Sequence, residues 1–442
     1  MDSVPPGLQK TRIGFHYFPD TLHYRDVDVN TWLPELQALA VSWLTVQAPL
    51  NRAIPESFIR HLREHEIQPV LHFAYPTNQL PSLDDFNLLC HSYAHWGAQY
   101  VVLFDRPNQR MNWSAAAWAQ SNLVERFLDI FQPLAMAAVQ AGLIPVFPPL
   151  EPGGDYWDTA FLRAAFEGLQ RRNQAQLLER MALGCYAWSN AHPLNWGSGG
   201  PERWPGAHPY ETPRGTEDQR GFRIFDWYLA LSEAVFGERR PILCLAGGAL
   251  PGETAFDVPS PETPHTTQNL LISRLIMGEK VALDPIPPEL LAFNFWLLTS
   301  THEHSSAQSA WYQPDGTILP IVPALQSWAA DHHWTTTQST HAAPISSSKH
   351  VNHRPIAHYL LIAGTDSTIS DWQLKVIRHF ADKYHPTIGF SPSEAVLASR
   401  VTVLGDQEKL PDSILDGLRA AGCVVDDLRG DGTTIATNLQ EY

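Results

Sequence analysis

Residues 100–113 read YVVLFDRPNQRMNW, and this stretch indicates how the chain folds. Its first part, residues 101–104, is a short apolar run that ends abruptly at an aspartate. Such a run, bounded by polar and turn-forming residues, is typical of a parallel strand that is buried on both faces. Residues 105–108 (DRPN) are then expected at the carboxyl end of this strand. In a parallel β/α barrel, that end carries the chemistry.

The same alternation of apolar strand-like segments and helical periodicity extends over the first 330 residues. The predicted strands cover residues 12–18, 41–47, 68–73, a segment beginning at 99, 143–147, 183–188, 242–245 and 292–298. The predicted helices cover residues 30–40, with Asn30 as N-cap, 55–65, 83–96, 121–141, 159–173, 219–236, 266–277 and 320–330. Eight strand–helix units predict a closed (β/α)8 barrel.

A second, smaller α/β domain is predicted after the barrel. Residues 332–355 are polar, rich in Ser, Thr and His, and without periodicity, so they predict a linker. Strand-like segments then follow at 359–363, 387–389, 401–404 and 423–426, with helical segments at 370–384 and 411–421. We therefore predict a barrel at 1–331, a linker at 332–355, and a small α/β domain of two or three layers at 356–442.

The composition narrows the classes of partner. The chain has 442 residues, 44% of them hydrophobic, and a formal net charge of −16. No Lys/Arg cluster offers the basic face that nucleic acid needs, so a neutral or cationic ligand is electrostatically favoured. No apolar run is long enough to cross a membrane. The N-terminus lacks the apolar core of a signal peptide, so we expect either an intracellular protein or one whose export signal lies outside this sequence.

Neither a metal nor another cofactor is predicted. Cys90, Cys185, Cys244 and Cys423 are far apart in apolar contexts, which favours buried small side chains over a metal or disulfide framework. The histidines of the linker lack the compact spacing of a ligand set. No G-x-G-x-x-G motif follows a strand, so no nucleotide is predicted.

Aromatic and polar residues near the predicted strand ends are candidate ligand contacts. Flat apolar faces of Trp and Tyr stack on sugar rings at wet sites, although core packing is the alternative for each one. His16 and Tyr17 end the first strand, where they are placed to bind sugar hydroxyls; a buried histidine is the alternative there. The tryptophans placed near the mouth include Trp157, Trp188, Trp196, Trp204 and Trp311. Trp196 and Trp204 lie in a long Gly/Pro-rich loop, residues 189–218, for which a functional role is favoured.

The barrel resembles the clan A glycoside hydrolases, a (β/α)8 superfamily of retaining enzymes. AWYQPDGTILPIVPALQSW (residues 310–328) is similar to the end of such barrels, as is the loop sequence WGSGGPERWPG. The resemblance covers roughly residues 12–330. It implies a general acid in an Asn-Glu-Pro motif after the fourth strand and a nucleophilic glutamate after the seventh, with carboxyls about 5–5.5 Å apart.

Both of these catalytic positions differ in this chain. DRPN at residues 105–108 matches the Pro and Asn of the family motif, but Arg106 stands in the place of the acid. A guanidinium is permanently charged and cannot donate a proton near neutral pH. At the seventh strand, PILCLAGG (residues 241–248) puts Ala246 at the position of the nucleophile. The resemblance therefore implies a barrel that has lost double-displacement hydrolysis.

Relocated carboxylates are the alternative. Asp105 forms either a local ion pair with Arg106 or half of a new catalytic pair, and Glu151 is the best-placed second member because it follows the fifth strand closely. Loop acids such as Glu202, Glu211 and Glu253 are further candidates. Asp105, Arg106 and Asn108 are also candidate ligand contacts.

The second domain resembles the cell-wall-binding type 2 repeats over residues 400–439, although GDGT at 430–433 lacks the Arg and Tyr of their last motif. That resemblance implies a cell-envelope setting. We therefore predict a glycosidase-like barrel that is catalytically inactive. We expect it to bind a carbohydrate, an envelope polymer or a protein partner at its mouth. An active glycoside hydrolase with relocated carboxylates and a structural or assembly protein are the two alternatives.

Overall fold

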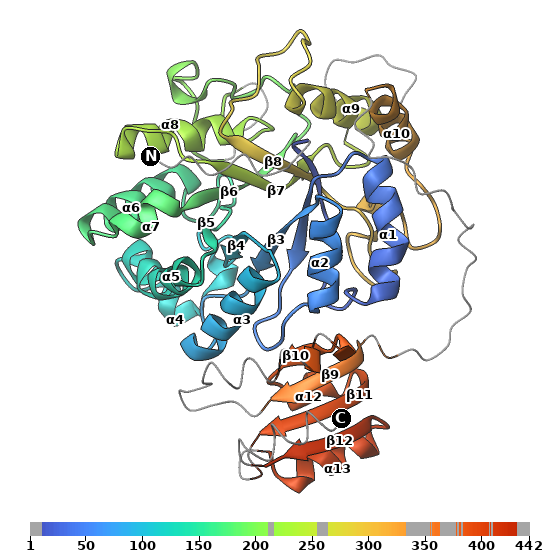
Figure 1. Ribbon diagram of the computed structural model, residues 1–442. Coiled ribbons are helices and arrows are strands. Elements are labelled where there is room, and N and C mark those ends of the chain that lie inside the picture. Colours follow the sequence, from blue (N-terminus) through green and yellow to red (C-terminus); the bar gives the residue numbers. More distant parts are fainter. Residues whose placement is uncertain are drawn as a thin grey trace.

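The computed structural model describes residues 11–210, 216–253, 264–332, 354, 356–362, 377, 380–381, 383–405, 407 and 410–430. The large domain is a closed barrel of eight strands in sequence order (Figure 1). All neighbouring strands are parallel, and β1 pairs with β8 to close the ring. The strands are β1 (Ile13–His16), β2 (Trp43–Gln47), β3 (Gln68–Phe73), β4 (Tyr100–Leu103), β5 (Ile144–Phe147), β6 (Ala182–Trp188), β7 (Ile242–Gly248) and β8 (Leu290–Phe295). The predicted fold class is confirmed.

Helices surround the barrel (Figure 1). The main ones are α1 (Asp26–Ala38), α2 (Glu56–Glu64), α3 (Leu83–His95), α5 (Leu123–Gln140), α6 (Asp158–Arg171), α8 (Ile224–Phe236), α9 (Pro264–Ile276) and α10 (Ile321–Asp331). The short helices α4 (Ala115–Trp118) and α7 (Ala175–Arg180) were not predicted.

Two predicted helix starts are wrong. Asn30 lies inside α1, which begins at Asp26, where the Asp28 carboxylate accepts hydrogen bonds from the backbone amide and the guanidinium of Arg25. Likewise α8 begins at Ile224 and not at residue 219. The Gln219 side chain instead donates a hydrogen bond to Asp158 at 2.7 Å, which ties the segment before α8 to the start of α6.

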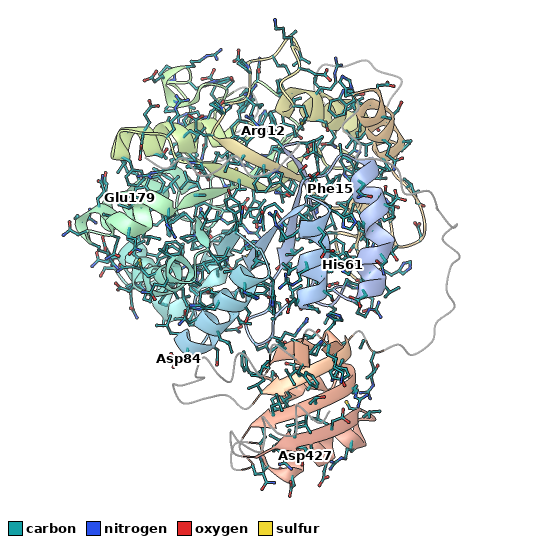
Figure 2. The ribbon with its side chains drawn as sticks, viewed as in Figure 1. Arg12, Phe15, His61, Asp84, Glu179 and Asp427 are labelled. Carbon is teal, nitrogen blue, oxygen red and sulfur yellow. The ribbon has the colours of Figure 1, made fainter. Side chains whose placement is uncertain are left out.

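The large domain has two apolar layers. Along β4, Val101 and Leu103 belong to the core between strands and helices, whereas Tyr100 and Val102 belong to the core inside the barrel. This is the two-residue alternation of a strand with both faces buried. Figure 2 shows Phe15 within the packed interior, while the exposed Glu179 lies at the edge of the domain.

The small domain is a four-stranded parallel sheet in the order β10-β9-β11-β12. Its strands are β9 (Ile356–Ile362), β10 (Thr387–Gly389), β11 (Ala398–Gly405) and β12 (Val424–Arg429), with helices α12 (Pro392–Ala395) and α13 (Asp412–Ala420). The four predicted strands are present, three of them with extended or shifted ends. Most of the predicted 370–384 helix, nearly all of the linker and residues 431–433 of the GDGT segment lie outside the described residues. The exact domain boundaries stay a prediction.

Barrel closure leads to a stability prediction at Gly14, which pairs with Asn294 of β8. A Cβ added there would lie 2.2 Å from Asn294 Oδ1 and 2.7 Å from the Trp43 carbonyl oxygen. We expect Gly14→Ala to lower the free energy of unfolding by about 1–3 kcal/mol, the usual cost of overpacking. Denaturant unfolding measures it. Gly206→Ala is the control, since the exposed Gly206 has only the end of the Glu217 side chain nearby, at 3.7 Å. Equal stability of the two variants would contradict the prediction.

Candidate functional site

The polar residues after β4 meet side chains from β6 and from the segment after β5 at the mouth. The Tyr186 hydroxyl donates to Asp105 Oδ1 at 2.7 Å, and Arg106 Nε donates to Asp105 Oδ2 at 3.1 Å. Arg106 Nη1 also lies 3.6 Å from Glu151 Oε2, and its guanidinium stands 5.6 Å from the centre of the Tyr186 ring. Asp105, Arg106, Glu151 and Tyr186 are called the mouth cluster below. The predicted ion pair between Asp105 and Arg106 is present.

The backbone turns sharply to form this cluster. Phe104 and Arg106 have φ values of 67° and 41°, in the left-handed region that residues other than glycine rarely adopt. The Arg106 amide donates to the Pro149 carbonyl at 3.0 Å, which fixes the turn against the segment after β5. Asn112 then donates to the carbonyl oxygens of Asp105 and Arg106 at 3.0 and 2.9 Å. Sequence reasoning missed Asn112, because nothing in its spacing shows that it returns to the strand end.

Charge in the mouth cluster centres on the guanidinium. Burial opposes ionisation of Arg106, but the neighbouring Asp105, Tyr186 and Glu151 outweigh it and raise the pKa of Arg106. Burial raises the pKa of Glu151, although Arg106 pulls it the other way. Burial and then Asp105 raise the pKa of Tyr186, so its hydroxyl keeps its proton and acts as a donor. The cluster therefore contains one fixed cation that two carboxyl groups share.

Asn108 links two loops. Its side chain is fully buried and donates to the carbonyl oxygens of Glu151 and Tyr156 at 2.8 and 3.0 Å, while its Oδ1 accepts from the Glu151 amide at 2.9 Å. All the side-chain groups of Asn108 thus hold the segment after β5 in place. Asn108 therefore positions Glu151, and whether it also contacts a ligand stays a prediction.

Two neutral histidines face the interior beside the mouth cluster. His16 and His72 are almost fully buried. Burial, with smaller effects from His72 and His304, lowers the pKa of His16 to about 3, and burial also lowers the pKa of His72. Gln47 Nε2 donates to His16 Nε2 at 3.3 Å, and His72 Nε2 donates to the Phe104 carbonyl at 3.1 Å. The Nδ1 atom of each histidine has no hydrogen-bond partner among the described residues.

Aromatic rings from β6 and the end of β8 continue this lining. The Trp188 ring lies 6.1 Å from that of Trp296 and 6.3 Å from that of Tyr186, measured between ring centres. The Trp296 ring lies 4.7 Å from that of His16, and a cis peptide bond joins Trp296 to Leu297. Trp188 and Trp296 are both partly exposed. The structure therefore brings the predicted Trp188 together with His16 and with Trp296.

Other predicted ligand contacts lie elsewhere. Tyr17 and Trp311 have no exposed surface, and both pack in the core between strands and helices. Tyr17 packs against Phe58 at 5.5 Å, and Trp311 against Phe15 at 4.6 Å, between ring centres. Both side chains therefore have a packing role, and whether either contacts a ligand stays a prediction.

Trp196 and Trp204 hold the loop after β6 together. Their rings lie 5.1 Å apart, and their indole N–H groups donate to the Asp218 and Ser198 carbonyl oxygens, each at 3.0 Å. Both are partly buried, and whether they also contact a ligand stays a prediction. Trp157 is 47% exposed, and its ring lies 5.6 Å from that of Tyr210, outside the mouth cluster.

The end of β7 carries no acid at the predicted position. Ala246 is buried and pairs with Tyr186 of β6. The next residue, Gly247, approaches β6 so closely that a Cβ would lie 2.6 Å from the Ala187 carbonyl oxygen. Glu253 accepts a hydrogen bond from the Ser189 hydroxyl, and Glu211 lies outside the described residues.

The described residues include neither a metal-binding cluster nor a membrane-spanning helix. In that part of the chain, no group of three or more His, Cys, Asp or Glu side chains is arranged to hold a metal ion. No helix among those described is long and apolar enough to cross a membrane.

The comparisons with known proteins bear on the fold only. No family model and no curated protein matches the chain. Among solved structures, it is similar to a GH128 (subgroup II) endo-β-1,3-glucanase from Sorangium cellulosum, at 14% identity over 72% of this chain and 98% of that one, with a TM-score of 0.39. A GH39 β-xylosidase from Caulobacter crescentus is 9% identical over 73% and 72% of the two chains, with a TM-score of 0.46. An endo-β-1,4-mannanase from Thermotoga petrophila is 10% identical over 80% and 82%, with a TM-score of 0.35. At these values the likeness carries no argument about function.

The depressed pKa of His16 predicts a pH dependence of stability. Its folded pKa of about 3 lies below the ordinary 6.5, so the unfolded chain binds this proton first as the pH falls. The contribution of the neutral His16 ring to the free energy of unfolding is fully present above about pH 6.5 and is lost steadily as the pH falls towards 3. Between pH 7.5 and 5.0 the loss is about 2 kcal/mol. Over the same pH interval, we expect the free energy of unfolding of His16→Gln to fall by about 2 kcal/mol less than that of the unmodified protein. Denaturant unfolding at each pH measures it. His91→Gln, at an exposed position on α3, is the control. Parallel pH profiles of the unmodified protein and His16→Gln would contradict the prediction.

Proposed function

We propose that this barrel binds a carbohydrate at its mouth and does not carry out double-displacement hydrolysis. The observation that carries the proposal is Arg106, which stands after β4 between Asp105 and Glu151. Beside it lie two partly exposed tryptophans and two buried neutral histidines. Flat apolar rings together with a few convergent polar groups suit the two faces and the hydroxyls of a sugar ring.

The unpartnered histidine nitrogens support a polar ligand. A buried polar atom without a hydrogen bond costs about 1–3 kcal/mol. His16 Nδ1 and His72 Nδ1 both carry this cost among the described residues. Both nitrogens are buried, so only a group that inserts beside the rings can partner them, and because both rings are neutral, the contact requires no charge on that group.

The absence of hydrolysis follows from what the strand ends offer. Retaining hydrolysis needs an acid that gives a proton to the leaving oxygen and a carboxylate that attacks the anomeric carbon. Arg106 cannot donate a proton at neutral pH, and the methyl group of Ala246 cannot attack. Asp105 is engaged by Arg106 and Tyr186, so its lone pairs already accept hydrogen bonds.

One observation favours a second function, an active glycoside hydrolase with relocated carboxylates. Burial raises the pKa of Glu151, which is the direction that a general acid requires. In that case Glu151 donates the proton and Asp105 serves as the second carboxylate. From the resemblance of residues 400–439 alone, we also propose a cell-envelope setting for either activity.

The binding proposal predicts that Trp188 and Trp296 are both needed. We expect Trp188→Ala and Trp296→Ala to weaken binding to the best ligand of a glycan array at least about tenfold, equivalent to about 1.4 kcal/mol, because each removes a stacking face. Titration calorimetry measures the effect. Trp32→Ala is the matched control, since Trp32 lies on α1, away from the mouth cluster, and packs there against Tyr312. Unchanged affinity in both mouth variants, or no glycan bound at all, would reject the proposal.

The second prediction separates binding from hydrolysis. We expect the unmodified protein to release no sugar from a panel of β-glycans, because neither expected catalytic position carries a carboxyl group. If it releases sugar and Glu151→Gln abolishes the release while Glu179→Gln does not, the active-hydrolase function replaces the one proposed. Hydrolysis gained by the double variant Arg106→Glu/Ala246→Glu would show that the mouth still aligns a substrate.

A further inference from the structure

The free edge of the small sheet is occupied by a segment of the barrel. β10 pairs with β9 on one side, and on its other side it forms an antiparallel bridge between Gly389 and Arg52. The Ala53 amide donates to the Ile388 carbonyl at 2.5 Å, and the Phe390 amide donates to the Asn51 carbonyl at 2.6 Å. Residues 51–53 lie in the loop after β2, at the mouth end of the barrel. These residues and 388–390 are called the strand-addition contact below.

The backbone pairing requires glycine at position 389. Arg52 and Gly389 are directly opposite each other and exchange no hydrogen bonds with one another, the arrangement in which opposed Cα atoms of antiparallel strands come closest. A Cβ on residue 389 would lie 2.5 Å from the Cβ of Arg52 and also too close to the Tyr359 hydroxyl. The two segments are therefore fitted to each other at this position.

The Arg52 side chain holds the contact through two partners. The side chain is 2% exposed. Its guanidinium donates to the Thr21 carbonyl in the loop after β1, and its Nε lies 3.0 Å from Glu394 Oε2 of α12. A buried charge is costly unless it is paired, so Arg52 depends on Glu394 of the other domain, whose side chain is 27% exposed.

Apolar packing joins the two domains at the same place. Ile388 and Phe390 pack against the core of the barrel and also against a core cluster of the small domain. On the barrel side, the Tyr93 hydroxyl of α3 accepts a hydrogen bond from the Ile54 amide at 2.8 Å, which fixes the end of the segment. The barrel segment is thus anchored on its own domain.

We propose that the β10 edge is a strand-addition surface whose resident partner is the barrel's own segment 51–53, and that Arg52 locks the two domains into one unit at the mouth. The inference is independent of what the mouth binds. An open strand edge invites pairing with another chain, and natural sheets cover such edges. Here the cover comes from the same chain, with backbone hydrogen bonds supplying the pairing and the Arg52–Glu394 ion pair supplying the specificity.

Amide hydrogen exchange of the full chain, read by mass spectrometry, tests the proposal. Peptides that contain Ala53 and Phe390 report on the two amides that donate across the contact, and a β4 peptide reports on the barrel. We expect both contact peptides to be protected in the unmodified protein. In Arg52→Ala and in Glu394→Gln, we expect both to exchange at least about tenfold faster, equivalent to about 1.4 kcal/mol of local opening, with β4 unchanged.

The matched control is Arg239→Ala, which removes a partly exposed ion pair with Glu233, at 2.8 Å, on the barrel alone. It should leave both contact peptides protected. If Arg52→Ala fails to fold, which loss of β4 protection would reveal, the milder Glu394→Gln decides the question. The proposal is overturned if the contact peptides of the unmodified protein exchange as fast as unstructured chain. It is also overturned if Glu394→Gln accelerates neither peptide, or only one of the two.

Discussion

Pairing of β1 with β8 closes the barrel, and the rest of the large domain depends on that closure. Asn294 of β8 takes the space that a side chain at Gly14 would fill, and its amide donates to the Cys244 carbonyl of β7 at 2.7 Å. The closed ring turns all eight carboxyl ends to one rim. Tyr186 and Asp105, which are 81 positions apart in sequence, can therefore share a hydrogen bond there.

At that rim, the guanidinium of Arg106 lies between the carboxyl groups of Asp105 and Glu151. Arg106 draws two carboxyl groups to itself, and the histidines beside it stay neutral because they are buried. The result is a set of fixed hydrogen-bonding groups with little capacity to exchange protons near neutral pH. Such a surface suits recognition of a neutral polar molecule, and this is the reason we propose binding over hydrolysis.

The sequence was sufficient for the barrel and for part of the site. Apolar runs that end in polar residues located all eight strands, because burial on both faces leaves a continuous hydrophobic pattern. The ends of those runs identified Asp105, Arg106 and Glu151, which do come together. His16 and Tyr17 show what was missed. They are consecutive, so they face opposite sides of the strand, one towards the interior and the other towards the helices. Proximity to a strand end does not say which face a residue occupies, and only the register of the folded sheet decides it.

Gly389 and Arg52 also affect whether the chain can be cut into two domains that are expressed separately. A cut within residues 333–353 looks natural on composition, since the neighbouring segments fold as separate sheets. The isolated barrel would then expose the apolar surface that Ile388 and Phe390 cover, and Arg52 would lose its counter-ion Glu394. The isolated small domain would present a bare strand. Each half is thus a poor candidate for expression alone, and a soluble fragment would have to carry both sides of the contact.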